Sequence, residues 1–419
     1  MGSSTIGRLS EMIRWLLVLV VLCFGPVTVA DPSPAGMKTL QTQSYVLHTD
    51  LEQPEAEAIG SHLDTMNEAY RELFSGFRMP PRAPMDVYVF QTEEAYLRFL
   101  RDSFGGDGTG SGGMFVTRGS RKALVCWKGD GGMDWVREVL QHEGFHQFAA
   151  ELFPSIPLWA NEGFAELFGH AVVVDGKVVL GEIPPGPLAR LQQARAADAL
   201  VPFNDFFEID SSVWGSHVRS GSAGLQYAQA WSLVHFFLYA QEGRWQQQFM
   251  SFLDQMNHGM EWQSAFRSTF KVKSWSEIQP AFLAYLETMQ ASDYRRVIQQ
   301  LEFLASGMQF LSRQEVYPST LQLLRQNLLT RRFEFTSHLF GAVLHMKADD
   351  DSLYRLPGTD GSTSMPHLVL ADDRGRPLHG STGGARRPWN IGTVGLEPRN
   401  FMVWWDRGRD GWTFRLGYE

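Results

Sequence analysis

The chain has 419 residues, with 46 acidic and 37 basic residues, a net charge of -9, 12 histidines and only 2 cysteines. At about 100 to 200 residues per domain, this length predicts two or three domains that can fold without disulfides. A hydrophobic share of 44% excludes extended disorder, because such a chain can bury enough apolar surface to offset the entropy of ordering. The acidic balance leaves no basic surface for a phosphate backbone and argues against nucleic acid as a partner.

The first 30 residues have the pattern of an export signal. Arg8 and Arg14 precede an apolar run over 15–24, and small residues at 28 and 30 form a cleavage pattern. We therefore predict a signal peptide at 1–30. The lack of any Asn-x-Ser/Thr glycosylation site points to the bacterial periplasm or to secretion. If the signal stayed uncleaved, it would provide the only membrane attachment.

Hydrophobic periodicity and turn residues indicate alternating strands and helices in the first half of the chain. In chain order we expect a strand at 44–49, a helix at 55–74, a strand at 85–90, a helix at 93–104, a glycine-rich loop at 105–113, strands at 114–117 and 122–127, and a helix at 134–153. Pro80 and Pro81 follow the first helix and stop it. This order predicts a mixed sheet with helices packed against it.

The second half of the chain is expected to be mostly helical. We predict a hairpin at 171–181 and helices at 159–170, 188–199, 226–242, 245–256, 261–269 and 276–289. After residue 329, strand-like segments separated by glycine, proline and aspartate turns predict a small β-rich domain. The predicted fold is therefore α+β, with a first domain at 31–290, a helical linker or extension at 291–330, and the β-rich domain at 331–419.

The helix expected at 134–153 contains the motif His142-Glu143-Gly144-Phe145-His146, an HExxH pattern. Two histidines four residues apart lie on one helical face, with about 5 to 6 Å between their Cβ atoms, so both rings can bind one metal ion. Glu143 flanks the open position of such a metal, where a carboxylate can take a proton from water. The motif therefore predicts a catalytic metal site.

A second carboxylate segment follows two helix-breaking prolines, Pro154 and Pro157. Glu162 comes 16 residues after His146, which gives the chain enough length for the next helix to fold back toward the metal. Two histidines, one glutamate and a water form the ligand set of a catalytic zinc site rather than a structural one. Glu166, one turn further on, can accept the remaining N–H of a ligand histidine and fix its tautomer.

These two segments resemble the gluzincin metallopeptidases, the group of thermolysin and the related aminopeptidases, and especially the peptidase MA-like proteins. The resemblance rests on HEGFH at 142–146 and on WANEGFAE at 159–166. It implies a thermolysin-like domain with a sheet half and a helical half. It also implies one zinc ion on His142, His146 and Glu162, Glu143 as the general base, and Glu166 with Asn161 as supporting residues. The 16-residue spacing is shorter than in thermolysin and suits the compact members.

The resemblance also suggests a group that stabilises the oxyanion. Gluzincins usually place a tyrosine or histidine from a later helix over the substrate oxygen, and Tyr227 resembles that tyrosine. A phenol aimed at a developing oxyanion would stabilise it. The alternative for Tyr227 is a core aromatic on a buried helix, and the sequence favours neither. His217, in an expected loop, and His235, in mid-helix, are the other candidates.

Substrate contacts are expected from the strands before the HExxH helix. In gluzincins the strand before this helix is an open edge that binds extended peptide, and 122–127 takes that place in the order, so Val125 is a candidate substrate-binding residue. Gly113-Met114-Phe115 resembles the glycine-containing substrate loop of the aminopeptidases, which adds Met114. The loop at 105–113 is expected to be a mobile surface loop. Cys126 is expected to be a buried thiol rather than a nucleophile.

The function predicted from these features is an exported zinc-dependent metallopeptidase that acts on peptides or proteins. The alternative is a non-catalytic zinc-containing binding protein of the cell envelope that keeps the peptidase fold. A structural zinc site is a poorer interpretation, because such sites favour closed, cysteine-rich ligand sets. The sequence does not distinguish endopeptidase from exopeptidase action, and it gives no oligomeric state.

Overall fold

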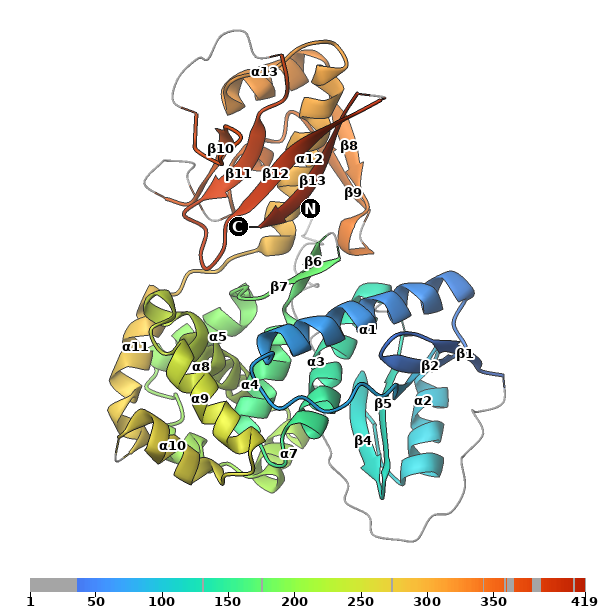
Figure 1. The fold of residues 1–419 in the computed structure, drawn as a ribbon, viewed down its shortest axis with the longest axis vertical. Helices are drawn as coiled ribbons and strands as arrows, with labels where there is room; N and C mark the ends of the chain where they lie inside the picture. The colour runs from blue at the N-terminus through green and yellow to red at the C-terminus, as the bar shows by residue number, and fades with distance from the viewer. Residues whose placement is uncertain are drawn as a thin grey trace, which may run out of the picture. The chain divides into compact units, whose positions relative to one another are not determined.

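The computed structural model describes residues 36–129, 132–174, 176–272, 274–341, 343–357, 359, 365–378, 386–409 and 411–418. The export signal predicted at 1–30 lies outside these residues. Within them, none of the helices combines the length and the apolar character needed to cross a membrane. The expected mixture of helices with strands is confirmed, and the strands form four separate sheets in the described part of the chain (Figure 1).

The described chain divides into two compact units. The first contains the residues up to Ala171 together with Pro185–Gln290, and the second contains Val172–Pro184 and Ala291–Glu419. The segment 291–330, predicted as a linker or extension, therefore belongs wholly to the second unit. The hairpin expected at 171–181 also belongs there, although it lies between two segments of the first unit in the sequence.

A five-stranded sheet forms one half of the first unit, in the order β1-β2-β3-β5-β4. Its strands are β1 (Lys38–Gln41), β2 (Tyr45–Thr49), β3 (Met85–Phe90), β4 (Gly113–Arg118) and β5 (Arg121–Trp127). β2, β3 and β5 run parallel, whereas β1 and β4 are antiparallel to their neighbours. β4 is therefore an edge strand, joined to β5 by a turn of two residues.

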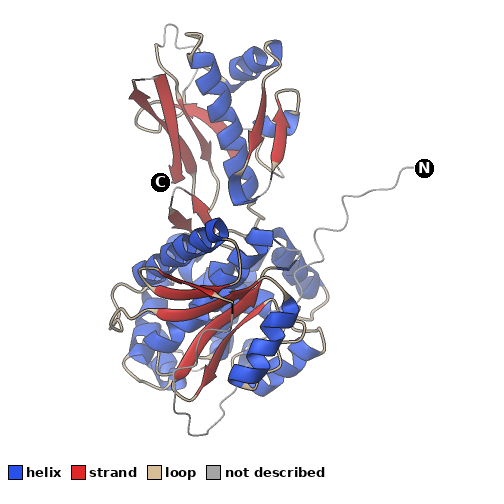
Figure 2. Ribbon diagram, turned by 90° about the vertical axis from the view of Figure 1, so that its right-hand side faces the viewer, coloured by secondary structure: helices blue, strands red, loops and turns tan. Residues whose placement is uncertain are grey.

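Helices cover both faces of this sheet, because its strands are apolar on both sides (Figure 2). Helices α1 (Gln53–Leu73) and α3 (Gly132–Leu152) pack on the face that presents Leu47, Val87 and Leu124. The other face packs against α2 (Glu93–Phe99) and the π-helical turn η1 (Leu100–Phe104).

The other half of the first unit is helical. Its elements are α4 (Leu158–Gly169), α5 (Pro185–Ala196), α6 (Phe203–Phe206), α7 (Ser211–Arg219), α8 (Gly224–Gly243), α9 (Gln246–Asn257), α10 (Trp262–Phe270), the short η3 (Trp275–Glu277) and α11 (Gln279–Thr288). α4 packs closely on the buried helix α8. A Cβ atom at Gly163 would lie 2.4 Å from the carbonyl oxygen of Ala230, so only glycine permits this approach.

The second unit is built around α12 (Tyr294–Ser312), which lies between a four-stranded sheet and the hairpin of β8 (Glu334–Ser337) and β9 (Leu344–Lys347) (Figure 2). The antiparallel sheet has the order β10-β11-β12-β13. The remaining elements are β6 (Val172–Val174), β7 (Lys177–Val179), α13 (Leu321–Thr330), η4 (Leu339–Gly341), η5 (Asp351–Tyr354), β10 (His367–Ala371), β11 (Asn390–Val394), β12 (Phe401–Gly408) and β13 (Gly411–Tyr418). Residues 331–419 thus share one hydrophobic core with α12 and α13.

Candidate metal centre

Helix α3 presents both histidines of the HExxH motif on one face. Their Nε2 atoms lie 3.1 Å apart, and both side chains are buried. The four-residue spacing accounts for this placement, because residues four apart in an α-helix lie one above the other. The expected pairing of His142 and His146 is therefore present.

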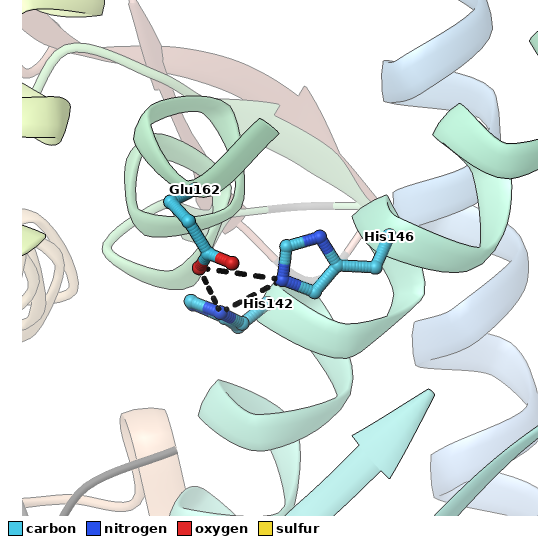
Figure 3. Close-up of side chains that lie close together, drawn as sticks. All are labelled: His142, His146 and Glu162. Atoms are coloured by element: carbon cyan, nitrogen blue, oxygen red, sulfur yellow. Dashed lines mark hydrogen bonds and ion pairs between the residues drawn. The ribbon is translucent and has the colours of Figure 1, made fainter. Parts of the chain in front are cut away.

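Helix α4 brings Glu162 to the same point (Figure 3). Its Oε2 atom lies 3.7 Å from Nε2 of His142 and 3.6 Å from Nε2 of His146. α3 ends at Leu152, and Pro157 precedes the first residue of α4, so the chain reverses direction within a few residues. α4 then packs back along α3, which places a fully buried carboxylate opposite the two rings.

These three side chains fit a divalent metal ion. In a tetrahedral zinc site with bonds of about 2.0–2.1 Å, the ligand atoms are about 3.3–3.4 Å from one another. The three separations here, 3.1, 3.7 and 3.6 Å, are close to that value. Both carboxylate oxygens of Glu162 are buried without a hydrogen-bond partner among the described residues. A buried carboxylate of this kind is costly unless a cation compensates it.

The ionisable groups of the centre depend strongly on one another. Burial alone would lower the pKa of His142, but the carboxylates of Glu162 and Glu166 raise it to about 10. Burial opposes ionisation of Glu162 as well, yet the charges of His146 and His142 hold its pKa below its usual value. The protein therefore stabilises carboxylates and positive charge together at this point, which is the electrostatic condition for holding a cation.

Glu166 contacts Nδ1 of His142, the ring nitrogen that does not face the other ligand candidates. Its Oε1 lies 3.2 Å from Nδ1 of His142, while its Oε2 lies 3.4 Å from Nε2 of His170. The role predicted for Glu166 requires this contact, because a carboxylate on Nδ1 fixes the tautomer that leaves Nε2 free. His170 was not predicted. The signal was available, since His170 follows Glu166 by four residues on the same helix.

Glu143 lies beside the three ligand candidates and is tied to the edge strand. Its side chain is fully buried, and its Oε2 accepts a hydrogen bond of 2.8 Å from the main-chain N–H of Phe115. The main-chain N–H of Trp127 donates to the carbonyl oxygen of Gly112, so the hydrogen bonds between β4 and β5 lie at the even-numbered residues of β4. The main-chain N–H of Phe115, an odd-numbered residue, therefore points away from β5. The other oxygen, Oε1, has no hydrogen-bond partner in the described chain.

Tyr227 is the candidate oxyanion group that lies next to the centre. Its ring centroid is 6.3 Å from that of His142. Burial raises the pKa of Tyr227 far above its usual range, and the nearby charge of Glu162 adds to this effect. The two alternatives are engaged elsewhere: Nδ1 of His217 lies 2.8 Å from Oε1 of Gln226, and Nδ1 of His235 lies 2.7 Å from the hydroxyl of Tyr285.

Met114 and Val125, the residues predicted to bind substrate, have their side chains on the face of the sheet away from α3. Both are buried in the hydrophobic cluster on the α2 face of the sheet, whereas Glu143 belongs to α3 on the opposite face. Segment 122–127 is also not an open edge, because β5 lies between β3 and β4. The edge is β4, since the two-residue turn after Arg118 folds β5 back along its inner side.

Two further expectations concern Asn161 and the loop at 105–113. The Oδ1 atom of Asn161 is buried without a hydrogen-bond partner in the part of the chain that is described, so no contact supports its predicted role. Two hydrogen bonds of Ser111 hold the end of the loop. Ser111 Oγ lies 2.5 Å from the hydroxyl of Tyr96, and the carbonyl of Ser111 accepts a 2.9 Å hydrogen bond from the indole of Trp127.

The first prediction concerns metal binding. Replacing either His142 or Glu162 with alanine should abolish binding of zinc, whereas Glu166→Gln should weaken it about 10- to 100-fold by loosening His142. His258→Ala removes an exposed histidine and serves as the control. Metal content after dialysis and competition with a chelator measure these effects. Unchanged zinc affinity in Glu162→Ala would remove Glu162 from the ligand set.

The second prediction concerns the hydrogen bond between β4 and Glu143. In Glu143→Ala, the amide of Phe115 should exchange its hydrogen at least about tenfold faster, because it loses a charged acceptor. The amide of Thr117 points to the same free edge and should not change. Residue-resolved hydrogen exchange measures both amides. Equal protection of Phe115 in the two proteins would show that the hydrogen bond does not form.

The functional evidence for this chain comes from the geometry of the centre. The chain matches no protein-family model and no curated protein. Two histidines, one glutamate and a neighbouring glutamate with a free oxygen, all buried on α3 and α4, therefore form the basis of the functional conclusion.

Proposed function

We propose that this protein is an exported, zinc-dependent metallopeptidase of the gluzincin type. The observation that carries the proposal is the position of Glu143, a buried carboxylate with one free oxygen, directly beside His142, His146 and Glu162. Burial raises the pKa of Glu143 above its usual value, and the charges of His146 and His142 offset only part of this rise. The substrates would be peptides or proteins, and the signal pattern at 1–30 supports export.

The arrangement of the first unit supports the same proposal. A mixed sheet ends in the edge strand β4, the HExxH helix α3 packs on that sheet, and a helical half supplies the third ligand candidate and Tyr227. An extended peptide can add to a free strand edge through main-chain hydrogen bonds. Such an edge beside Glu143 suits a peptide substrate better than a small rigid one.

The proposed mechanism assigns one task to each side chain. A bound zinc ion would act as a Lewis acid, which polarises a carbonyl group and makes water more acidic. Glu143 takes the proton from the attacking water with its free oxygen, and later gives that proton to the leaving amine. The hydroxyl of Tyr227 donates a hydrogen bond to the developing oxyanion. Glu166 holds the His142 ring in its orientation.

The third prediction tests the general base. Glu143→Gln should lower kcat for peptide hydrolysis about 10²- to 10⁴-fold, because an amide cannot accept the proton. Its zinc content should stay at the wild-type level. Glu57→Gln, at an exposed glutamate of α1, serves as the control. Hydrolysis of a mixed peptide library, followed by mass spectrometry, measures the activity. Wild-type protein that binds one zinc ion but cleaves no peptide would be a binding protein instead.

The fourth prediction tests Tyr227. Tyr227→Phe should lower kcat about 10²- to 10³-fold with little change in KM, because only the oxyanion donor is lost. Metal content should stay the same. Tyr239→Phe, on the same helix, is the matched control. An unaffected kcat would make Tyr227 a core aromatic, as the alternative from the sequence has it.

A further inference from the structure

The first unit contains a cavity of about 380 Å³ that is separate from the candidate metal centre. Its walls include Asn67 and Arg71 of α1, Pro81 and Arg82 before β3, and Gln147 and Phe148 of α3. No ligand candidate of the centre lines it, nor do Glu143, Glu166 or Tyr227. The volume falls within the range of about 300–1,000 Å³ that is typical of small-molecule sites.

Arg71 offers an unused guanidinium edge to this cavity. Its Nε donates a 3.1 Å hydrogen bond to Oδ1 of Asn67, which fixes the group. No described residue accepts a hydrogen bond from its two Nη atoms. Arg82 lies nearby but is engaged by Glu68 at 2.8 Å. Burial, and then the charge of Arg82, lower the pKa of Arg71, so an anion beside Arg71 would relieve an unfavourable environment.

Gln147, another lining residue, has an acceptor without a donor. Its side chain is 2% exposed, and its Nε2 donates a 3.1 Å hydrogen bond to the carbonyl of Asp86. This bond fixes the orientation of the amide. The Oε1 atom is buried and has no hydrogen-bond partner among the described residues. Because a buried acceptor without a donor is costly, a ligand that brings an N–H group would stabilise this wall.

Two further charged groups of the lining have partners: Arg121 donates to the hydroxyl of Tyr88 at 3.4 Å, and Asp86 lies 3.5 Å from Nε2 of His48. Phe148 and Met85 supply apolar surface, and Pro81 belongs to a rigid proline-rich segment at the rim. Lys122, which also lines the cavity, is paired with Glu151 at 2.6 Å. The cavity therefore offers a ligand the guanidinium of Arg71, the Oε1 atom of Gln147 and an apolar wall.

We propose that this cavity binds the carboxy-terminal residue of a peptide. The carboxylate takes the two Nη groups of Arg71 in a forked pair of hydrogen bonds, and the N–H of the same residue donates to Oε1 of Gln147. An apolar side chain of that residue packs on Phe148. An N-acylated amino acid is the smallest molecule with all three features. The site does not depend on peptide hydrolysis at the metal centre.

Calorimetric titration of the full-length protein tests this site. N-acetyl-leucine is the probe. Two matched compounds each lack one feature: N-acetyl-leucine amide lacks the carboxylate, and 4-methylpentanoate lacks the N–H. A third compound, inorganic phosphate, lacks both the N–H and the apolar group. We expect N-acetyl-leucine to bind at least about tenfold more tightly than each of them. Equal binding of the amide, or of phosphate, would overturn the proposal.

Variants assign the binding to the cavity. Arg71→Gln should weaken N-acetyl-leucine binding at least about tenfold, because the forked ion pair is lost. If Arg71→Gln fails to fold, Arg71→Lys keeps the charge, loses the fork and should also bind more weakly. Gln147→Leu should weaken binding while leaving metal content unchanged. Arg98→Gln, at an exposed residue paired with Glu94, should bind as the wild type does.

Removal of the metal separates this site from the proposed active site. Protein treated with a chelator should still bind N-acetyl-leucine, because the cavity shares no residue with the metal centre. Loss of binding after chelation would place the ligand on the metal and overturn the proposal. Absence of binding by the wild type at about 20 mM probe, a concentration where even millimolar affinity is visible, would also overturn it. None of these outcomes requires the protein to be a peptidase.

Discussion

Buried charges on α3 and α4 depend on one another, and the arrangement of the first unit follows from that constraint. Glu162 has no exposed surface, and among the described residues its carboxylate is compensated by the two histidine rings of α3 at 3.6–3.7 Å. Separating the two helices would leave an uncompensated charge in the interior, which is strongly unfavourable. The contact between α3 and α4 therefore has to be held by the surrounding packing.

The helical half supplies that packing. α4 is clamped between α3 and α8, and the glycine at 163 lets the backbone of α8 approach it closely. Stacked aromatic rings fill the other side of α4: Phe145 of α3 stacks on Phe164 at 5.5 Å and on Phe168 at 5.4 Å. Apolar contacts of this kind set the distance between α3 and α4, whereas the polar groups set how far one helix is shifted along the other. A small displacement of α4 would move Glu162 away from both histidines.

Much of the candidate site could be predicted from the sequence, because helical spacing sets it locally. His142, His146 and Glu166 lie where a period of 3.6 residues places them. The edge strand could not be predicted in the same way. β4 and β5 are apolar on both faces, so their side-chain pattern does not tell which face meets α3. The hydrogen bond from Phe115 uses a main-chain group, which no side-chain pattern reveals.

Domain assignment from the sequence had a similar limit. Helix α12 has an amphipathic pattern that fits either a linker helix or a core helix, and only its contacts show that it is the centre of the second unit. The hairpin of β6 and β7 is too short to carry a domain signal of its own. Val172 and Val179 of this hairpin pack in the core around α12, although α12 lies far from them in the sequence. Long-range packing of this kind decides where a short element belongs.

Helix α3 is unusual because polar side chains lie on more than one of its buried faces. One face carries His142, Glu143 and His146, and another carries Gln147 toward the cavity beside Arg71. A purely structural helix in this position would bury apolar residues, since each buried polar group needs a partner to offset its desolvation. Several polar atoms of α3 lack such a partner within the described chain, among them Oε1 of Glu143 and of Gln147. The two orphaned acceptors on separate faces of α3 correspond to the two sites proposed for this helix.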